Sequence, residues 1–170
     1  MYVSLDVSKQ EKDCKYFSLY RAKINDENLK FEKIFDPNKC IKNNYGGRIS
    51  FGDVNNKSGI ILTTGATEED AIKAQDNNSH LGKILFFEEN NFQPEIISKG
   101  HRNPQGLFVE DTLILSTEHG PYGGDEINKI SIGNNYGWPI ASYGDNYDFD
   151  IGNQDYSFKK SHRDSGFTEP

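Results

Sequence analysis

The sequence predicts an all-β fold of about ten short strands, and three observations indicate it. Apolar and polar residues alternate with a period of two over several short segments, which is typical of half-buried strands. Sixteen glycines and many asparagine-containing turns divide the chain at short intervals. Almost no stretch is typical of a helix, so antiparallel strands joined by turns should form most of the protein.

The N-terminal part is expected to hold one strand followed by a hairpin. Residues 2–7 alternate with a period of two, and residues 16–24 are rich in aromatic and β-branched side chains. Residues 29–36 alternate again, and the turn formers at 25–28 join them to the preceding strand. Pro37 ends the hairpin, because proline cannot donate to a strand ladder.

The two cysteines flank this hairpin. If the turn centres near Glu27, then Cys14 faces Cys40 across the pair of strands. Directly opposed strand residues lie close to the separation that a disulfide requires, and a disulfide would indicate an oxidising compartment. Two free thiols are the alternative interpretation, and the sequence leaves both open.

Further strands are predicted over the rest of the chain, at 46–53, 59–65, 82–89, 94–100, 106–111, 112–118 and 125–131. Residues 55–59 should form a hairpin loop. The connection 66–81 is long and polar, with one possible helical turn from Glu68 to Ala74, and long loops in compact folds tend to be functional. Residues 145–170 have no clear period and are interpreted as an insertion loop or a tail.

Composition and motif searches exclude several classes of function. The net charge of −7 argues against nucleic acid or an anionic membrane as the main partner. No apolar run approaches the roughly 20 residues of a membrane helix. The first residues lack the basic head and apolar core of a signal peptide, so either the protein is cytoplasmic or the chain lacks its true start. The four histidines lack zinc-site spacing.

The most unusual stretch is 98–144, where turns between strands carry groups that bind anions or metals. These groups are Arg102, Asn103, Gln105, Glu118, His119, Asp125 and Glu126. An arginine such as Arg102 can bind a carboxylate through two parallel hydrogen bonds. The Gly120-Pro121 turn leaves backbone carbonyls that could point outward, and calcium prefers oxygen ligands.

Four segments occur in order in this stretch: Arg-Asn-Pro-Gln-Gly (102–106), Glu-His-Gly-Pro (118–121), Gly-Gly-Asp-Glu (123–126) and Asn-Tyr-Gly-Trp-Pro (135–139). With these four segments in this order, the chain resembles the soluble PQQ-dependent sugar dehydrogenases, which form the glucose/sorbosone and aldose sugar dehydrogenase family. The resemblance implies a six-bladed β-propeller, of which about half, roughly three blades, is present here.

The implied organisation is a partial propeller domain over residues 1–170. Residues 1–40 would be an incomplete blade, 41–100 a blade, 101–144 a blade that carries the cofactor and calcium motifs, and 145–170 a loop or tail. A half propeller leaves sheet edges exposed. The resemblance therefore implies a missing propeller half, supplied either by the same full-length chain or by a homo-oligomer.

The resemblance also assigns candidate site residues. The predicted cofactor-binding residues for PQQ are Arg102, Asn103, His119, Gly120 and Pro121, and the predicted calcium ligands are Gly120, Pro121, Glu126 and Tyr136, the last through its carbonyl. The calcium would act on the quinone as a Lewis acid. Alternatives remain at each position: Arg102 could tie a loop to a carbonyl, Gly120-Pro121 could be an ordinary turn, and Trp138 could pack between blades.

Two positions depart from the family pattern. The family's His-x-x-Gly-Arg segment, whose histidine is the general base, reads Asn44-Tyr45-Gly46-Gly47-Arg48 here. An amide cannot accept a proton at neutral pH, so Asn44 at the base position is expected to be inactive. The acidic residue that could orient this base is replaced by Ala66.

Two functions are therefore predicted from different classes. The first is PQQ-dependent oxidation of an aldose sugar, with an external electron acceptor and a location in the periplasm or outside the cell. The alternative is a catalytically lapsed propeller that binds PQQ, calcium or sugar. A piece of propeller with no activity of its own is a third interpretation.

Overall fold

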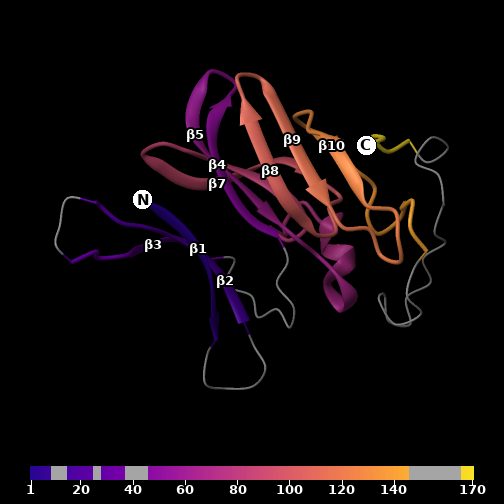
Figure 1. The fold of residues 1–170 in the computed structure, drawn as a ribbon, viewed down its shortest axis with the longest axis horizontal. Helices are drawn as coiled ribbons and strands as arrows, with labels where there is room; N and C mark the ends of the chain where they lie inside the picture. Colours follow the sequence, from indigo (N-terminus) through magenta and orange to yellow (C-terminus); the bar gives the residue numbers. More distant parts are fainter. Residues whose placement is uncertain (9–14, 25–27, 37–45, 146–165) are drawn as a thin grey trace.

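A computed structural model of the protein describes residues 1–8, 15–24, 28–36, 46–145 and 166–170. The described strands form three sheets, in the orders β1-β2-β3, β11-β7-β6-β5-β4 and β10-β9-β8. Neighbouring strands are antiparallel except for β11, which runs parallel to β7. The first sheet lies at the N-terminal end of the molecule and packs against the second, and the second and third sheets lie against each other (Figure 1).

The first sheet contains β1 (Tyr2–Ser8), β2 (Lys15–Arg21) and β3 (Glu32–Phe35). Strands β2 and β3 form the predicted hairpin, and Leu19 faces Phe35, which is the register that the predicted turn requires. Cys14 and Cys40 lie outside the described residues, so their pairing stays a prediction.

The second sheet contains β4 (Gly46–Val54), β5 (Lys57–Thr64), β6 (Lys83–Glu88), β7 (Asn91–Lys99) and β11 (Asn134–Asn135). The turn between β4 and β5 has only two residues, Asn55 and Asn56, with φ of 52° and 62°. Asparagine tolerates this left-handed conformation, and two such residues match the twist of a tight hairpin. The predicted loop over 55–59 is therefore too long, and β5 begins at Lys57.

The third sheet contains β8 (Pro104–Glu110), β9 (Leu113–Glu118) and β10 (Glu126–Lys129). After β10 the chain returns to the second sheet, where β11 pairs with the end of β7. The segment that follows the third sheet thus completes the edge of the second one and connects the two sheets.

The connection between β5 and β6 holds the predicted helical turn, the 3₁₀ helix η1 (Glu68–Ala74). Its C-terminal end is fixed by Lys83, whose side chain is fully buried. The Lys83 ammonium donates to the carbonyl oxygens of Lys73 at 2.7 Å, Ala74 at 3.0 Å and Leu81 at 2.7 Å. Burial lowers the pKa of Lys83 to about 7.

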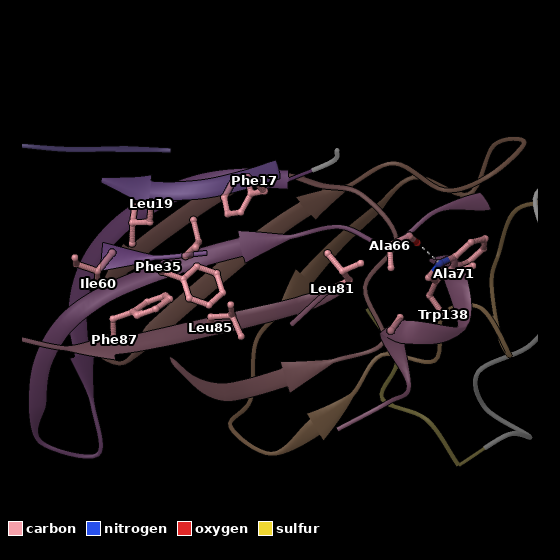
Figure 2. Close-up of a cluster of buried hydrophobic side chains, with 12 residues drawn as sticks. Phe17, Leu19, Phe35, Ile60, Ala66, Ala71, Leu81, Leu85, Phe87 and Trp138 are labelled. Carbon is pink, nitrogen blue, oxygen red and sulfur yellow. Dashed lines mark hydrogen bonds between the residues drawn. The ribbon is translucent and has the colours of Figure 1, made fainter. Parts of the chain in front are cut away.

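Two hydrophobic cores hold the three sheets together. The first lies between the first and second sheets, where Phe17, Leu19, Phe35 and Phe87 pack together, and it continues to Trp138 beside η1 (Figure 2). The second core joins the second and third sheets. No helix in the described ranges is long and apolar enough to cross a membrane.

Candidate functional site

Most of the predicted site residues meet at one small cavity, beside the starts of β8 and β10 and the end of β9. Six of the eight line it, namely Arg102, His119, Gly120, Pro121, Glu126 and Tyr136. Glu118, Trp138, Ala141 and Ser142 complete the lining that the structure describes. The cavity volume of about 10 Å³ is close to the minimum for one water-sized particle, so a single ion fits but a larger ligand does not.

Arg102 ties the loops at this cavity to one another. Its Nη1 donates to the carbonyl oxygen of Gly120 at 2.8 Å, and its backbone N–H donates to Oε2 of Glu118 at 3.1 Å. The guanidinium lies 5.3 Å from the ring centre of Trp138, which is within cation–π range. The Gly120 carbonyl therefore accepts a hydrogen bond from Arg102, and its role as a calcium ligand stays a prediction.

Asn103 also has a positioning role. It is buried, its Oδ1 accepts a hydrogen bond from Gln105 Nε2 at 2.8 Å, and its carbonyl accepts one from the His119 N–H at 3.1 Å. The Arg48 side chain donates through Nε to the Gln105 carbonyl. These contacts join the starts of β4 and β8 to the end of β9, so the predicted anion-binding residues share one hydrogen-bonded frame.

Two carboxylates lie side by side at the centre of this frame. Asn128 Nδ2 donates to Oε1 of Glu118 at 2.9 Å and to Oε2 of Glu126 at 3.2 Å. Burial, followed by the nearby charge of Glu118, raises the pKa of Glu126 to about 8. Two like charges in a poorly solvated place repel each other, so the pair favours a shared proton or a bound cation.

His101 supports the pair from behind. Its side chain is fully buried, with Nδ1 3.4 Å from Glu118 Oε1 and Nε2 2.9 Å from Ser98 Oγ. The imidazole stacks on Tyr136 with 4.9 Å between ring centres. Tyr136 in turn donates its hydroxyl to the Lys129 carbonyl. Glu118 is thus held in place by buried neighbours on two sides.

An open groove of about 370 Å³ lies next to the cavity. Its described lining is Gln105, Thr117, Glu118, His119, Asp125, Glu126 and Ile127. His119 and Asp125 form an exposed pair, with 3.2 Å between Nδ1 and Oδ2. Hydrogen bonds from the Gly120 N–H and from His119 lower the pKa of Asp125. With three carboxylates in its lining, the groove attracts cations more strongly than anions.

Among the described residues that follow the predicted base position, Arg48 belongs to the same hydrogen-bonded frame. Asn44 lies outside the described residues, but β4 begins two residues later at Gly46. Ala66 is described: it is 2% exposed, its N–H donates to the Arg102 carbonyl at 2.9 Å, and its carbonyl accepts from Trp138 Nε1 at 2.7 Å (Figure 2). The position where the family pattern has an acidic residue is therefore part of the apolar core.

The donor set fits calcium better than a metal that requires several acidic or imidazole ligands. No cluster of three or more His, Cys, Asp or Glu suited to a metal ion occurs among the described residues. Calcium accepts carbonyl oxygens beside one or two carboxylates, and Glu118 and Glu126 supply the carboxylates here. For an anionic cofactor such as PQQ, the acidic groove fits only if a cation neutralises it, whereas Arg102 supplies a positive charge nearby.

Sequence reasoning named Glu118 among the groups that could bind anions or metals but gave it no defined role, and it did not name Asn128, although both are central to the site. The alternation in β9 contained the signal, since Ile114, Ser116 and Glu118 are the buried residues of that strand. A carboxylate on the inward face of a strand requires a partner. The partner, Asn128, lies at a buried position of β10.

Comparisons with known proteins identify the family of the chain. The sequence model of the Glucose / Sorbosone dehydrogenase family matches residues 1–170. The chain is 33% identical over 141 residues to the aldose sugar dehydrogenase YliI of Escherichia coli, covering 74% of this chain and 36% of that protein. It is 35% identical over 106 residues to quinoprotein glucose dehydrogenase B of Acinetobacter calcoaceticus, covering 55% of this chain and 22% of that protein.

Solved structures of sugar dehydrogenases align with almost the whole chain. The soluble aldose sugar dehydrogenase from Escherichia coli, in its apo form, aligns with a TM-score of 0.75 at 26% identity, over 99% of this chain and 52% of that one. The PQQ-bound aldose sugar dehydrogenase from Streptomyces coelicolor aligns with a TM-score of 0.65 at 25% identity, over 99% and 48%. The chain thus spans about half the length of these structures, and its fold is a partial β-propeller. It belongs to the glucose/sorbosone dehydrogenase family.

Proposed function

We propose that this chain forms the cofactor-binding part of a PQQ-dependent sugar dehydrogenase, with calcium at the Glu118–Glu126 pair and PQQ in the adjacent groove. The observation that carries the proposal is the convergence of six predicted site residues on one cavity the size of an ion. The quinoprotein and PQQ-bound relatives support the identity of the cofactor. The substrate class, an aldose sugar, follows from the family.

In this proposal the chain's residues position the cofactor and balance its charge. Glu126 would hold calcium as an ionised carboxylate, because the cation would stabilise that form. Arg102 holds the Gly120 carbonyl and keeps a positive charge next to the groove. When bound, PQQ supplies a quinone that accepts two electrons from the sugar. The carboxylates that line the groove would repel the carboxylates of PQQ, so calcium should bind before PQQ.

A second candidate is a lapsed member that binds the cofactor without turnover. The buried Ala66 favours it, because no carboxylate can orient a base from that position. Asn44 favours it for the same chemical reason, since the amide cannot remove the sugar's hydroxyl proton. The two candidates share the binding site and differ only in the proton acceptor.

Calorimetric titration of PQQ into calcium-loaded protein tests the binding site that the two candidates share. We expect binding that disappears when calcium is removed by chelation and weakens in Glu126→Gln, which keeps the side-chain size but removes the charge. Asp76→Asn is the matched control, because Asp76 is exposed in the connection between η1 and β6. Calcium-independent binding, or equal loss in both variants, would contradict the proposed site.

Dye reduction in the presence of an aldose sugar separates the two candidates. An active dehydrogenase reduces the dye with the natural Asn44, whereas a lapsed member does not. Asn44→His should then create or raise turnover if the remaining site is intact. PQQ binding without any gain from Asn44→His would show that the loss of catalysis goes beyond the base.

The source of the other propeller half and the cellular location of the protein are also proposals. We infer that the propeller is closed either by further sequence of the same protein or by a second copy of this chain, since the chain spans about half of the solved relatives. Sedimentation of the purified chain distinguishes these arrangements. The periplasmic or extracellular location predicted from the family is tested by fractionation of cells that produce the protein.

A further inference from the structure

A second and larger cavity lies at the opposite end of the strands that carry the proposed cofactor site. It has a volume of about 400 Å³, which is within the range of small-molecule sites. Val109, near the end of β8, and Asp111, in the turn before β9, line it, whereas the cofactor site begins at Arg102 before the same strand. Seven strand residues separate the two ends by roughly 20 Å. In Figure 1 the tight turns after β4 and β8 lie at the end away from η1.

The walls of this cavity are aromatic and its floor is apolar. Tyr2 from β1 and Phe51 from β4 have ring centres 5.4 Å apart, with their planes tilted by 58°. The Phe51 side chain is 61% exposed, although it lies on a strand that contacts two other sheets. The buried Ile60 forms part of the floor. Both aromatic side chains line the cavity, and aromatic rings attract organic cations.

The remaining polar lining is acidic. Asp53, Glu89 and Asp111 contribute carboxylates, and none of the described residues that line the cavity is a lysine or arginine. Asp53 accepts a hydrogen bond from Ser58 Oγ at 2.6 Å, which fixes its carboxylate at the rim. The three acidic residues come from three different turns or strands, so the negative field converges on the cavity.

The size and spacing of these groups exclude a bare metal ion as the ligand that fits best. The described acidic residues do not converge closely enough to form a metal cluster, and the cavity is far larger than one ion. We propose that this cavity binds a small organic ammonium ion, with its charge between the carboxylates of Asp53 and Asp111 and its alkyl groups against Tyr2 and Phe51. The site is independent of the proposed cofactor site.

Choline is a suitable probe, with 3,3-dimethyl-1-butanol as an uncharged molecule of the same shape. Calorimetric titration should detect choline, and the alcohol should bind at least about tenfold more weakly because it lacks the charge. Phe51→Leu should weaken choline binding about fivefold, since it removes one aromatic face from an exposed position without opening the core. Thermal unfolding of each variant verifies that the fold is retained.

Asp111→Asn is the sharpest test of the charge. Asp111 has φ of 50°, a conformation that asparagine tolerates well, so the substitution removes the charge and leaves the turn intact. Glu110→Gln is the matched control, because it removes the same charge one residue away from the lining. The proposal predicts weaker choline binding in Asp111→Asn alone. Equal binding of the alcohol, equal weakening by Glu110→Gln, or no choline binding up to about 10 mM would overturn it.

Discussion

Two buried charged sites in this protein have opposite surroundings. The Lys83 ammonium, between η1 and β6, has three backbone carbonyl oxygens within 3.0 Å. The carboxylates of Glu118 and Glu126, between β9 and β10, share one amide from Asn128 and repel each other. Three backbone carbonyls surround the first charge, whereas the second site places two like charges side by side, with His101 and Arg102 among its described basic neighbours.

This difference distinguishes a buried charge with a structural role, Lys83, from a pair of charges suited to bind a ligand, Glu118 and Glu126. A buried charge whose hydrogen-bond partners are supplied by the fold needs no ligand, although burial still disfavours its ionised form. A pair of like charges in a poorly solvated place weakens the native state until a ligand neutralises it. Lys83 should therefore respond to mutation and, because its pKa is lowered to about 7, to pH, whereas the carboxylate pair should respond to calcium and to pH.

Replacement of Lys83 by methionine should have the largest effect. The side chain would still fill the space, but the Leu81 carbonyl and the end of η1 would lose their donor, which should lower the free energy of unfolding by about 3 kcal/mol. Denaturant unfolding measures it. Lys57→Met is the control, because Lys57 is half exposed in a surface ion pair with Glu88 and should cost at most about 1 kcal/mol. Similar losses in both variants would contradict the structural role of Lys83.

Calcium should produce the next largest change. At a concentration about 100 times its dissociation constant, a ligand that binds only the native state adds about 2.7 kcal/mol to the free energy of unfolding. Glu118→Gln or Glu126→Gln should remove most of this gain, and both should raise the stability of the calcium-free protein because they end the repulsion. Thermal unfolding with calcium or with a chelator provides the measurement. A gain that survives in both variants would place calcium elsewhere.

The pH dependence of the calcium-free protein follows from the raised pKa of Glu126. The folded state holds this proton up to about pH 8, whereas an unfolded glutamate releases it near 4.5, so between these values the folded state binds more protons. The stabilising contribution is full below the unfolded pKa and is lost as pH rises through the folded one. Glu126→Gln should flatten this slope. An unchanged slope in that variant would assign the effect to another group.

The sequence predicted the strands well because their signals are local. Alternation, β-branched side chains and turn residues act over a few positions, so the amino-acid pattern alone was enough to place the hairpin of β2 with β3 and the helical turn η1. The turn at Asn55-Asn56 was predicted too long, since glycine and serine at 58–59 are equally typical of turns and strand pairing decides between them.

The candidate site was only partly predictable, because its interactions connect distant positions. The motifs indicated Arg102, Gly120, Glu126 and Tyr136, and the structure brings these residues to one cavity. The engagement of the Gly120 carbonyl by Arg102 spans 18 positions, and no local pattern encodes it. No local pattern indicated the role of Lys83, because the three carbonyls around it have no sequence signature.

Arg102→Lys should give the smallest effect on stability. It tests whether Arg102 has only a structural role or also binds the cofactor. Lysine keeps the charge and one donor for the Gly120 carbonyl, but it lacks the planar guanidinium that lies over Trp138. We expect a loss of about 1 kcal/mol in the free energy of unfolding. Trp138 is the single tryptophan of the chain, so its emission should shift in this variant.

Arg48→Lys is the control for this measurement, because Arg48 also ties a loop to a carbonyl, that of Gln105, but has no described contact with Trp138. Weaker PQQ binding in Arg102→Lys beyond this stability loss would assign Arg102 to the cofactor. Unchanged PQQ affinity together with the expected loss of stability would instead make Arg102, like Lys83, a cation whose partners are backbone carbonyls, and the carboxylate pair would remain the part of the frame that needs a ligand.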